Sequence, residues 1–542
     1  MTNAEIAAVF DQVADLLEFQ GANPFRVRAY RNGARAIREL PESVETIASD
    51  PQRDLTDIAG IGKDLAGKVV TLLESGSLPM LDELLKQVPA SVLAMLRVPG
   101  LGPKRAAILY NQLHVTNLDD LREACTAHRV RELKGFGEKT EAAILQGLDI
   151  ALQAAQRVYW AEADQIAQSI SAHLRQCPSI KQLEFAGSYR RGKDTVGDLD
   201  ILVVADDPAK AMDYFAKFPG IGQVLAHGDT KMSVRLATGF QVDLRAVPEK
   251  SFGAALQYFT GSKAHNVVLR GIAKSRGLKL NEYGVFRDEQ QIGGRTEQEV
   301  YGAVDLPVIP PELREARQEF DWAAAGKLPV LVELKDIRGD LHDHSTWTDG
   351  LATIEEMAEA AMKRGWQYLA VTDHSKRVAM VGGLDASHLR RQWAEIDKLN
   401  KRLSGFTVLK GVEVDILEGG GLDLDDDVLA EADWVVASVH YGQNQPRQQI
   451  TRRVVEALQN PHVWAIAHPT GRLLNRRGPY EIDLDTVLKA ARDYGKFMEL
   501  NAHPSRLDLD DVACAAAKNY GVPIVIATDA HSINGLDAMR YG

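Results

Sequence analysis

The sequence predicts a multidomain protein: an all-helical N-terminal region, a mixed α+β middle and a C-terminal α/β barrel. Three observations support this prediction. A short glycine pattern recurs three times between helical segments in the first 150 residues. A strand with two alternate aspartates, Asp198 and Asp200, lies among further strands and helices. Beyond residue 337, most of the apolar strands end in a histidine, aspartate or glutamate, and helices separate many of them, as in an α/β barrel.

Length and composition limit the class of protein. A chain of 542 residues exceeds one ordinary domain, and its 45% hydrophobic and 25% charged content is typical of globular proteins. No apolar stretch reaches the roughly 18 residues of a membrane span, and the N-terminus lacks the pattern of a signal peptide. Cys125, Cys177 and Cys514 form no metal or disulfide pattern. We expect a cytoplasmic protein without a membrane partner. The net charge of −12 means that any binding of nucleic acid must come from local motifs.

The three N-terminal repeats each place one apolar residue between two glycines, with helices expected before and after. Such a turn exposes backbone N–H groups at the start of the second helix, where a phosphate oxygen binds directly or through K⁺ or Na⁺. A lysine follows each turn. The glycines are Gly60, Gly62, Gly100, Gly102, Gly135 and Gly137.

The middle region carries a predicted metal and phosphate site. In a strand, Asp198 and Asp200 point to the same side, and two adjacent carboxylates favour a divalent cation between them. The preceding turn offers the hydroxyl of Ser188 and the guanidinium of Arg191 to polyphosphate oxygens. Asp243, on another strand, either faces solvent at a sheet edge or is a third ligand.

A second segment, YFTGSKAHN, suggests a nucleotide pocket. Tyr258 and Phe259 precede a tight turn at Gly261, and Asn266 and Arg270 lie one helical turn apart. These side chains either contact a sugar and base or, for the two aromatic residues, belong to the core.

The C-terminal strands predict a metal cluster. Nine ligand-type residues at strand ends suffice for about three ions such as Zn²⁺ or Mn²⁺. They are His342, His344, Asp349, His374, Glu413, His440, His468, Asp529 and His531. Nearby arginines either hold DNA or are solvated; these are Arg447, Arg452, Arg453, Arg472, Arg476 and Arg477. We expect the last barrel helix to be short.

The motifs GSYRRGK, GDLDILV, FQVDLR, YFTGSKAHN and LNEYGVF resemble those of family X DNA polymerases, the group of DNA polymerase beta. The glycine repeats resemble helix-hairpin-helix motifs, which bind the DNA backbone; Glu141 replaces a small residue in the third. The resemblance implies that Asp198, Asp200 and Asp243 bind two Mg²⁺ or Mn²⁺ ions. It also implies that Gly187, Ser188 and Arg191 hold the triphosphate, that Tyr258, Phe259, Gly261 and Asn266 form the sugar and base pocket, and that Arg270 lies near the template.

The N-terminal segment NPFRVRAYR resembles the lyase domain of the same family. Lys68 matches its Schiff-base lysine, and Arg26 and Tyr30 match positions that contact a 5′-phosphate. Asp64 stands where that family has a lysine, so lyase activity and a plain surface charge at Lys68 both remain open.

The strand ends H-x-H, T-D-H, G-x-E, S-V-H, A-H-P and T-D-A-H resemble the PHP domain (polymerase and histidinol phosphatase). The resemblance implies metal-dependent phosphoester hydrolysis with two to three Zn²⁺ or Mn²⁺ ions. Beside a polymerase this implies 3′–5′ exonuclease activity and, as an option, cleavage at abasic sites. His503 lies outside the usual ligand set.

These inferences give one functional hypothesis: a monomeric DNA polymerase that fills short gaps in gapped or nicked DNA from deoxynucleoside triphosphates and carries a 3′–5′ exonuclease. The alternatives are a DNA-docked nuclease with an inactive polymerase half and a non-catalytic binder of DNA structures. The expected segments are lyase-like 1–85, fingers-like 86–155, palm 156–250, thumb-like 251–318, linker 319–336 and PHP 337–542.

Overall fold

The computed structural model describes residues 1–542 except 2, 39, 41–43, 59, 90, 97, 99–100 and 155–156. The chain forms two compact units, one made of 3–151 with 332–542 and the other of 152–331. In the described ranges, no helix has both the length and the apolar character needed to cross a membrane.

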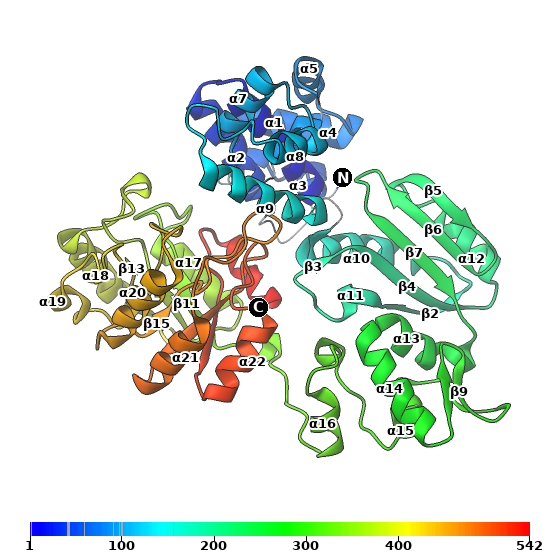
Figure 1. Ribbon diagram of the computed structural model, residues 1–542. Helices are drawn as coiled ribbons and strands as arrows, with labels where there is room; N and C mark the ends of the chain where they lie inside the picture. Colours follow the sequence, from blue (N-terminus) through cyan, green and yellow to red (C-terminus); the bar gives the residue numbers. More distant parts are fainter. Residues whose placement is uncertain are drawn as a thin grey trace. The chain divides into compact units, whose positions relative to one another are not determined.

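The regular elements described between residues 3 and 154 are all helices (Figure 1). In each glycine turn the apolar residue is buried, namely Ile61, Leu101 or Phe136, while most of the described glycines are exposed. The turn is therefore anchored by its central side chain. The helices are α1 (Asn3–Phe19), α2 (Pro24–Arg38), α3 (Val44–Ser49), α4 (Lys63–Ser75), α5 (Pro79–Gln87), α6 (Ser91–Leu96), α7 (Pro103–Leu113), α8 (Leu118–Thr126) and α9 (Glu138–Ala154).

Two of the elements before the glycine turns differ from the expected helices, and the second one agrees with the expectation. A short 3-10 helix, η1 (Leu55–Asp57), precedes the first turn, α6 precedes the second, and turns precede the third. The third departs because Glu141 is buried and binds the preceding loop, accepting from the Arg131 backbone N–H at 2.9 Å and from His128 at 3.0 Å. Gly100 lies outside the described residues.

The palm-like part of residues 152–331 is a five-stranded sheet in the order β2-β4-β7-β6-β5. β4 and β7 are parallel, and their register pairs Asp200 with Asp243. Helices α10 (Trp160–Leu174) and α12 (Pro208–Phe215) accompany the sheet. Its strands are β2 (Ile180–Phe185), β4 (Asp198–Ala205), β5 (Ile221–His227), β6 (Lys231–Leu236) and β7 (Gln241–Ala246). A small pair, β1 (Val158–Tyr159) and β3 (Thr195–Val196), lies beside it.

The thumb-like part has its own core, and the start of the expected linker belongs to it. Helix α16 (Glu319–Ala324) contributes buried Ala323 to the cluster that contains Tyr301 and Ile309. The other elements are η2 (Glu249–Ser251), α13 (Phe252–Thr260), α14 (Lys263–Ser275), β8 (Lys279–Asn281), β9 (Gly284–Arg287), β10 (Gln290–Gly293), α15 (Glu297–Gly302) and η3 (Pro311–Leu313).

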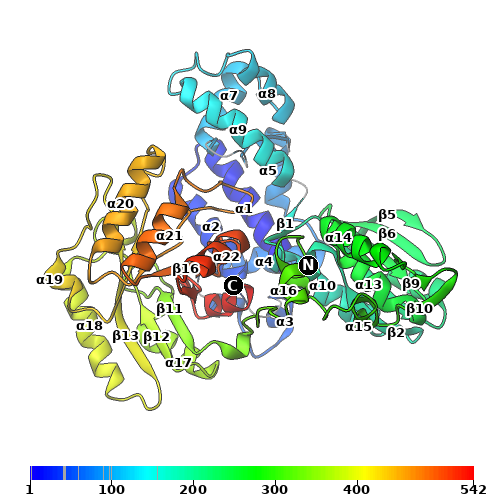
Figure 2. The ribbon, with the colours of Figure 1, turned by 60° about the horizontal axis from the view of Figure 1, so that its bottom comes forward.

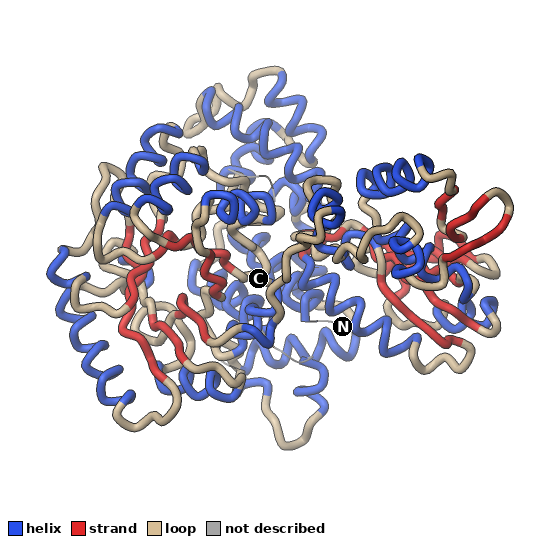
Figure 3. Tube along the Cα trace, turned by 90° about the horizontal axis from the view of Figure 1, so that it is seen from below, coloured by secondary structure: helices blue, strands red, loops and turns tan. Residues whose placement is uncertain are grey.

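Residues 339–542 form a seven-stranded parallel barrel, which confirms the expected α/β fold. Consecutive strands are neighbours, and a parallel bridge between Asp343 and Ala530 joins the first strand to the last. Helices surround the strands (Figures 2 and 3). The strands are β11 (Gly339–Asp343), β12 (Tyr368–Val371), β13 (Thr407–Asp415), β14 (Trp434–Ser438), β15 (Ala465–Ile466), β16 (Phe497–Asn501) and β17 (Ile524–Ala527).

The barrel helices follow the strands in alternation, so the carboxyl ends of the strands meet at one face. They are α17 (Ile354–Lys363), α18 (Ala386–Asn400), α19 (Asp426–Leu429), α20 (Arg447–Gln459), α21 (Leu484–Asp493) and α22 (Asp511–Tyr520). The last element, η6 (Asn534–Tyr541), is a short 3-10 helix, as expected.

Candidate functional site

The structure brings Asp198, Asp200 and Asp243 together at one edge of the palm-like sheet. Asp198 and Asp200 flank Leu199, which is fully buried. The two carboxylates therefore project from the face of β4 opposite to the Leu199 side chain. Asp243 lies beside Asp200 on the adjacent strand β7. Asp243 is buried and therefore does not face solvent at a sheet edge.

The three carboxylates repel one another in the absence of a cation. Burial, Asp198 and Asp243 together raise the pKa of Asp200 to about 7. Burial and Asp243 also raise the pKa of Asp198. Asp243 accepts hydrogen bonds from the Ser233 hydroxyl and, at 3.2 Å, from the Gln241 amide. Oxygen ligands with an excess of negative charge fit a divalent cation such as Mg²⁺ or Mn²⁺.

The turn before these aspartates is fitted closely to them. The Ala186 N–H donates to the backbone oxygen of Asp200 at 2.8 Å. Gly187 has φ +64°, and a Cβ there would lie 2.8 Å from Asp200 Oδ2. Glycine is therefore required both by backbone conformation and by space. Ser188 follows in the short helix α11 (Gly187–Arg190), beside the carboxylates.

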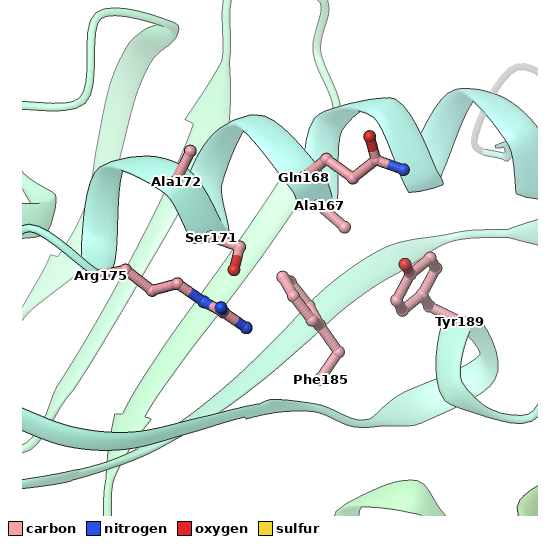
Figure 4. Close-up of a pocket in the computed structure, with 7 residues that line it drawn as sticks. All are labelled: Ala167, Gln168, Ser171, Ala172, Arg175, Phe185 and Tyr189. Atoms are coloured by element: carbon pink, nitrogen blue, oxygen red, sulfur yellow. The ribbon is translucent and has the colours of Figure 1, made fainter. Parts of the chain in front are cut away.

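Aromatic side chains hold this turn against α10. The Tyr189 hydroxyl donates to Asp164 at 2.7 Å, and Trp160 stacks on the Tyr189 ring at 5.3 Å. Figure 4 shows Phe185 and Tyr189 facing α10 across a cavity of about 320 Å³. None of the residues predicted to be catalytic lines this cavity.

Two arginines connect the turn to the thumb-like part. Arg190 donates to both oxygens of Glu297, at 3.0 and 2.8 Å. Arg191 donates to Glu315 at 2.9 Å and to the backbone oxygen of Thr260. The Arg191 side chain is only 14% exposed, so binding of a triphosphate would require it to share or exchange these partners.

The predicted nucleotide pocket is assembled in the thumb-like part. Asn266 donates to the backbone oxygen of Tyr258 at 2.7 Å, and the Arg270 guanidinium lies 5.1 Å from the Tyr258 ring centre. Gly261 turns the chain between α13 and α14 with φ +67°. Phe259 lies under Arg245, at 4.7 Å. Tyr258 and Phe259 are partly exposed, which a ligand contact needs, and Phe259 also packs against the small core that contains Leu202 and Phe252.

The predicted lyase residues also lie together. Lys68 forms an ion pair with Asp64 and lies 5.5 Å from the Tyr30 ring centre. The buried Tyr30 hydroxyl faces the Met80 sulfur at 2.9 Å, while Arg26 is exposed. Burial lowers the pKa of Lys68, but Asp64 and Tyr30 outweigh burial and the pKa is raised. A protonated amine is not nucleophilic, so this arrangement opposes Schiff-base chemistry.

The nine predicted barrel ligands meet at the carboxyl ends of the strands. Glu413 is central: His374 Nδ1 lies 2.7 Å, His468 Nε2 3.0 Å and His440 Nε2 3.4 Å from its carboxylate. His344 Nε2 lies 3.2 Å from Asp529. The remaining three residues complete the cluster: Asp349 lies 3.3 Å from His531, and His342 lies 3.7 Å from both Glu413 and Asp529.

Three groups of these side chains have the geometry of metal sites: one contains His344, Asp349, His374 and His531, another His342, His344 and Asp529, and the third His374, Glu413 and His440. Several of their buried atoms form no hydrogen bond, namely His342 Nε2, both His344 ring nitrogens, His374 Nδ1, Asp349 Oδ1 and Glu413 Oε2. The 2.7 Å approach of His374 Nδ1 to Glu413 is an ion-pair distance without hydrogen-bond geometry. Buried polar atoms are almost always paired, so these atoms fit bound cations.

The electrostatics of the barrel agree with metal binding. Burial and the neighbouring His531 and His374 lower the pKa of His344 to about 3, which leaves it neutral. Burial opposes the charge on Glu413, but the surrounding histidines, His440 first, hold its pKa well below the usual range. Neutral imidazole and ionised carboxylate are the ligand forms that metals require.

Sequence reasoning missed two carboxylates that orient the histidines. Glu499 Oε1 lies 2.6 Å from His342 Nδ1, and Asp415 Oδ1 lies 3.2 Å from His440 Nδ1. Each bond leaves Nε2 of the same ring facing the cluster. Glu499 is a charged residue inside an apolar strand and Asp415 is two residues from Glu413, which were the available sequence signals.

The predicted DNA-binding arginines mostly have other partners. Arg453 is fully buried and donates to the Tyr441 backbone oxygen, and Arg472 and Arg477 also donate to backbone oxygens. The Arg453 prediction is therefore corrected, because its guanidinium is inaccessible to DNA. Arg447 and Arg452 are exposed and pair with nearby carboxylates. Arg476 is exposed, and His503 faces Ser505 at 2.9 Å.

Family models match five segments of the chain. They are the helix-hairpin-helix domain at 1–78, the SAM-like helix-hairpin-helix tandem at 92–149, the DNA polymerase beta palm at 157–232, the DNA polymerase beta thumb at 255–315 and the PHP domain at 340–503. Asp243 lies outside the palm match, and Asp529 and His531 lie outside the PHP match.

Curated relatives match the whole chain or its parts. The DNA polymerase/3′-5′ exonuclease PolX of Bacillus subtilis is 43% identical over 100% of this chain and 95% of its own length. DNA polymerase lambda of Rattus norvegicus is 26% identical over 58% of this chain and 56% of its own length. A probable phosphatase of Thermoanaerobacter is 36% identical over 35% of this chain and 78% of its own length.

Proposed function

The chain belongs to the family X DNA polymerases that carry a PHP domain, and we propose that its two reactions are divided between the palm and the barrel. These reactions are DNA synthesis and 3′–5′ exonucleolytic cleavage. The observation that carries the proposal is the presence of two separate sets of ligand-type side chains, the palm aspartates and the nine barrel residues. Each set comes from one compact unit of the chain.

In the palm, Asp198, Asp200 and Asp243 hold two Mg²⁺ or Mn²⁺ ions. When bound, these ions acidify the primer 3′-hydroxyl and neutralise the leaving pyrophosphate. Ser188 and Arg191 bind the triphosphate, and Gly187 allows it to approach the carboxylates. Tyr258, Phe259, Gly261 and Asn266 position the sugar and base of the incoming nucleotide, and Arg270 meets the template strand. The protein itself mainly orients the reactants.

In the barrel, the nine ligands hold two to three divalent ions, with Zn²⁺ and Mn²⁺ the candidates because imidazoles predominate. When bound, these ions activate the attacking water and stabilise charge on the phosphate. The Glu413 carboxylate lies within 3.8 Å of histidines from all three groups. Glu499 and Asp415 orient His342 and His440. The substrate is the 3′-terminal phosphodiester of DNA.

The N-terminal glycine turns bind the DNA backbone, directly or through K⁺ or Na⁺, so that the substrate is gapped or nicked DNA. On the helix after the third turn, Glu141 forms hydrogen bonds with the loop that precedes this turn. The first two turns therefore carry most of the DNA binding. We retain as proposals the segment boundaries 1–85, 86–155, 156–250 and 337–542, a monomeric state and a cytoplasmic location. The thumb-like segment, expected at 251–318, extends through α16 and shortens the expected linker 319–336.

The experiment is primer extension on a gapped duplex whose primer is labelled at its 5′ end. Asp198→Ala should abolish longer products and leave Mn²⁺-dependent shortening intact. His344→Ala should do the reverse, because it removes a residue shared by two of the barrel groups.

The same gel separates the alternatives. Shortening without extension in the unaltered chain would indicate a nuclease docked by an inactive polymerase half, and unchanged primers would indicate a DNA-structure binder. Extension that survives Asp198→Ala would contradict the assignment of the palm carboxylates.

A further inference from the structure

Arg506 lies beside the barrel cluster. Its Nε is 3.6 Å from Oδ2 of Asp529, and its side chain is 22% exposed. It therefore reaches the ligand cluster from one side and solvent from the other. Arg506 comes from the loop after β16, whose strand also supplies Glu499.

The backbone around Arg506 is fixed on several sides. Asn501 and Asp508 form a backbone bridge that closes the loop. Arg472 Nε donates to the backbone oxygen of Arg506 at 3.0 Å, and the Thr470 N–H donates to Asp508 at 3.0 Å. Because the backbone is held in this way, the Arg506 side chain starts from a fixed position at the edge of the cluster.

Other arginines of this face are committed to fixed structure. Arg453 is buried against backbone and amide oxygens, and Arg477 donates to the Gly471 backbone oxygen at 2.7 Å. Arg506 instead faces Asp529, a carboxylate of the cluster. A cation held by Asp529 would neutralise that carboxylate and weaken its attraction for the guanidinium, which is then available to another anion.

We propose that Arg506 binds the non-bridging oxygens of the scissile phosphodiester at the barrel site, an inference that rests on the proposed hydrolytic function. The planar guanidinium fork matches two phosphate oxygens. Its place next to Asp529 puts these donors beside the ions that would hold the same phosphate. Arg506 would thus favour the anionic phosphate and its charge-developing transition state.

The test uses the full chain carrying Asp198→Ala, so that the palm carboxylates do not contribute, loaded with Mn²⁺. Arg506→Gln should raise the inhibition constant for inorganic phosphate and lower kcat/KM for 3′-nucleotide removal, each by about 10- to 100-fold, as expected for a lost charge-assisted hydrogen bond. Arg506→Lys should recover part of the loss. Arg492→Gln is the matched control. Arg492 pairs with Asp493 on α21, and its substitution removes the same charge as Arg506→Gln.

Two further measurements separate phosphate binding from a structural role. Metal content after dialysis, measured by elemental mass spectrometry, should equal that of the parent. Competitor DNA with a neutral methylphosphonate at its 3′-terminal linkage should bind the parent more weakly than ordinary DNA, and Arg506→Gln should reduce that preference about tenfold or more. Loss of metal in Arg506→Gln, or an unchanged preference for the charged linkage, would overturn the inference.

The outcome is distinguishable from failure of the proposed function. If His344→Ala hydrolyses DNA as well as the parent, the barrel is not the nuclease and both proposals fail. If His344→Ala abolishes hydrolysis and Arg506→Gln matches the Arg492→Gln control, only the role of Arg506 is rejected.

Discussion

Lys68 is held by Asp64, one helical turn before it, and this pair decides whether the N-terminal region has an active amine. The ion pair and Tyr30 outweigh the effect of burial and leave the pKa of Lys68 above its usual 10.5. At neutral pH almost all of the amine is therefore protonated. Asp64, which stands where the resembling family has a lysine, therefore raises the pKa of Lys68.

Asp64→Ala should lower the pKa of Lys68 and increase covalent trapping by borohydride on DNA with a 5′-deoxyribose phosphate. Each pKa unit gained corresponds to about a tenfold larger neutral fraction. The trapping yield should rise with pH in both proteins, with the curve of Asp64→Ala displaced to lower pH. The double variant Asp64→Ala/Lys68→Ala is the control and should give no adduct; superimposed pH curves for Asp64→Ala and the unaltered chain would reject the mechanism.

The orientation of the barrel histidine rings also depends on single residues. The bond between Glu499 and His342 joins residues 157 positions apart, and it fixes which ring nitrogen faces the cluster. Glu499 is 2% exposed and also accepts from the His468 backbone N–H, so one carboxylate contacts the ends of two other strands, β11 and β15. Ligand identity thus depends on local motifs, and ligand orientation depends on distant partners.

At the scale of elements, the turn between β2 and β4 links the sheet to the predicted chemistry. Its glycines are not equivalent. Gly187 and Gly192 both have positive φ, at +64° and +63°. A Cβ at Gly187 would lie 2.8 Å from Asp200 Oδ2, whereas a Cβ at Gly192 would lie 3.8 Å from its nearest neighbour, Glu312 Cγ.

Gly187→Ala should therefore displace Asp200 and lower kcat/KM for nucleotide incorporation by roughly tenfold or more. A tenfold loss requires the activation free energy to rise by only about 1.4 kcal/mol. Barrel exonuclease activity should not change. Gly192→Ala carries similar backbone strain without the collision and should retain most incorporation. Equal losses in the two variants, measured by single-nucleotide incorporation, would attribute the effect to strain alone.

A second element, α16, shows how the thumb-like core extends beyond the expected boundary. Glu319 at its start lies 2.9 Å from His265 Nδ1, and His265 Nε2 lies 2.9 Å from the Tyr301 hydroxyl. His265 also stacks on Phe320. The helix is therefore fastened to the base of α14, which carries Asn266, and the exposed extended segment begins only after α16.

At the scale of the whole molecule, the two compact units should respond differently to metal. The barrel cluster has buried atoms without partners, and cations would supply those partners. Binding to the folded state alone adds about 2.7 kcal/mol per site when free metal is 100 times the dissociation constant.

Reloading the chelated chain with Zn²⁺ or Mn²⁺ should consequently raise the temperature of one unfolding transition in scanning calorimetry. His344→Ala should abolish most of that shift, and Asp198→Ala should retain it. A shift that is preserved in His344→Ala, or lost in Asp198→Ala, would place the stabilising ions elsewhere than in the barrel.

The sequence by itself determined the features that depend on local spacing. Alternation along β4 put Asp198 and Asp200 on one side, because strand period is a local property. The strand-end motifs pointed to nine residues that meet at one end of the barrel, because connection order is also local, and their role as metal ligands stays a prediction. The glycine turns followed for the same reason, apart from the missing helix before Gly135. The family resemblance then supplied an expected role for each residue.

Only the tertiary structure decided what depends on contacts between distant segments. It paired Asp243 with Asp200, buried Arg453, joined Glu499 to His342 and brought Arg506 to Asp529. Local pattern does not select these contacts: it leaves Asp243 between solvent and a metal site, and it marks Glu499 only as a charged residue inside an apolar strand. A charged residue in a loop or strand has the same local pattern whether it meets solvent or a partner. Packing of separate elements selects the partner, and with it the protonation and orientation on which the chemistry depends.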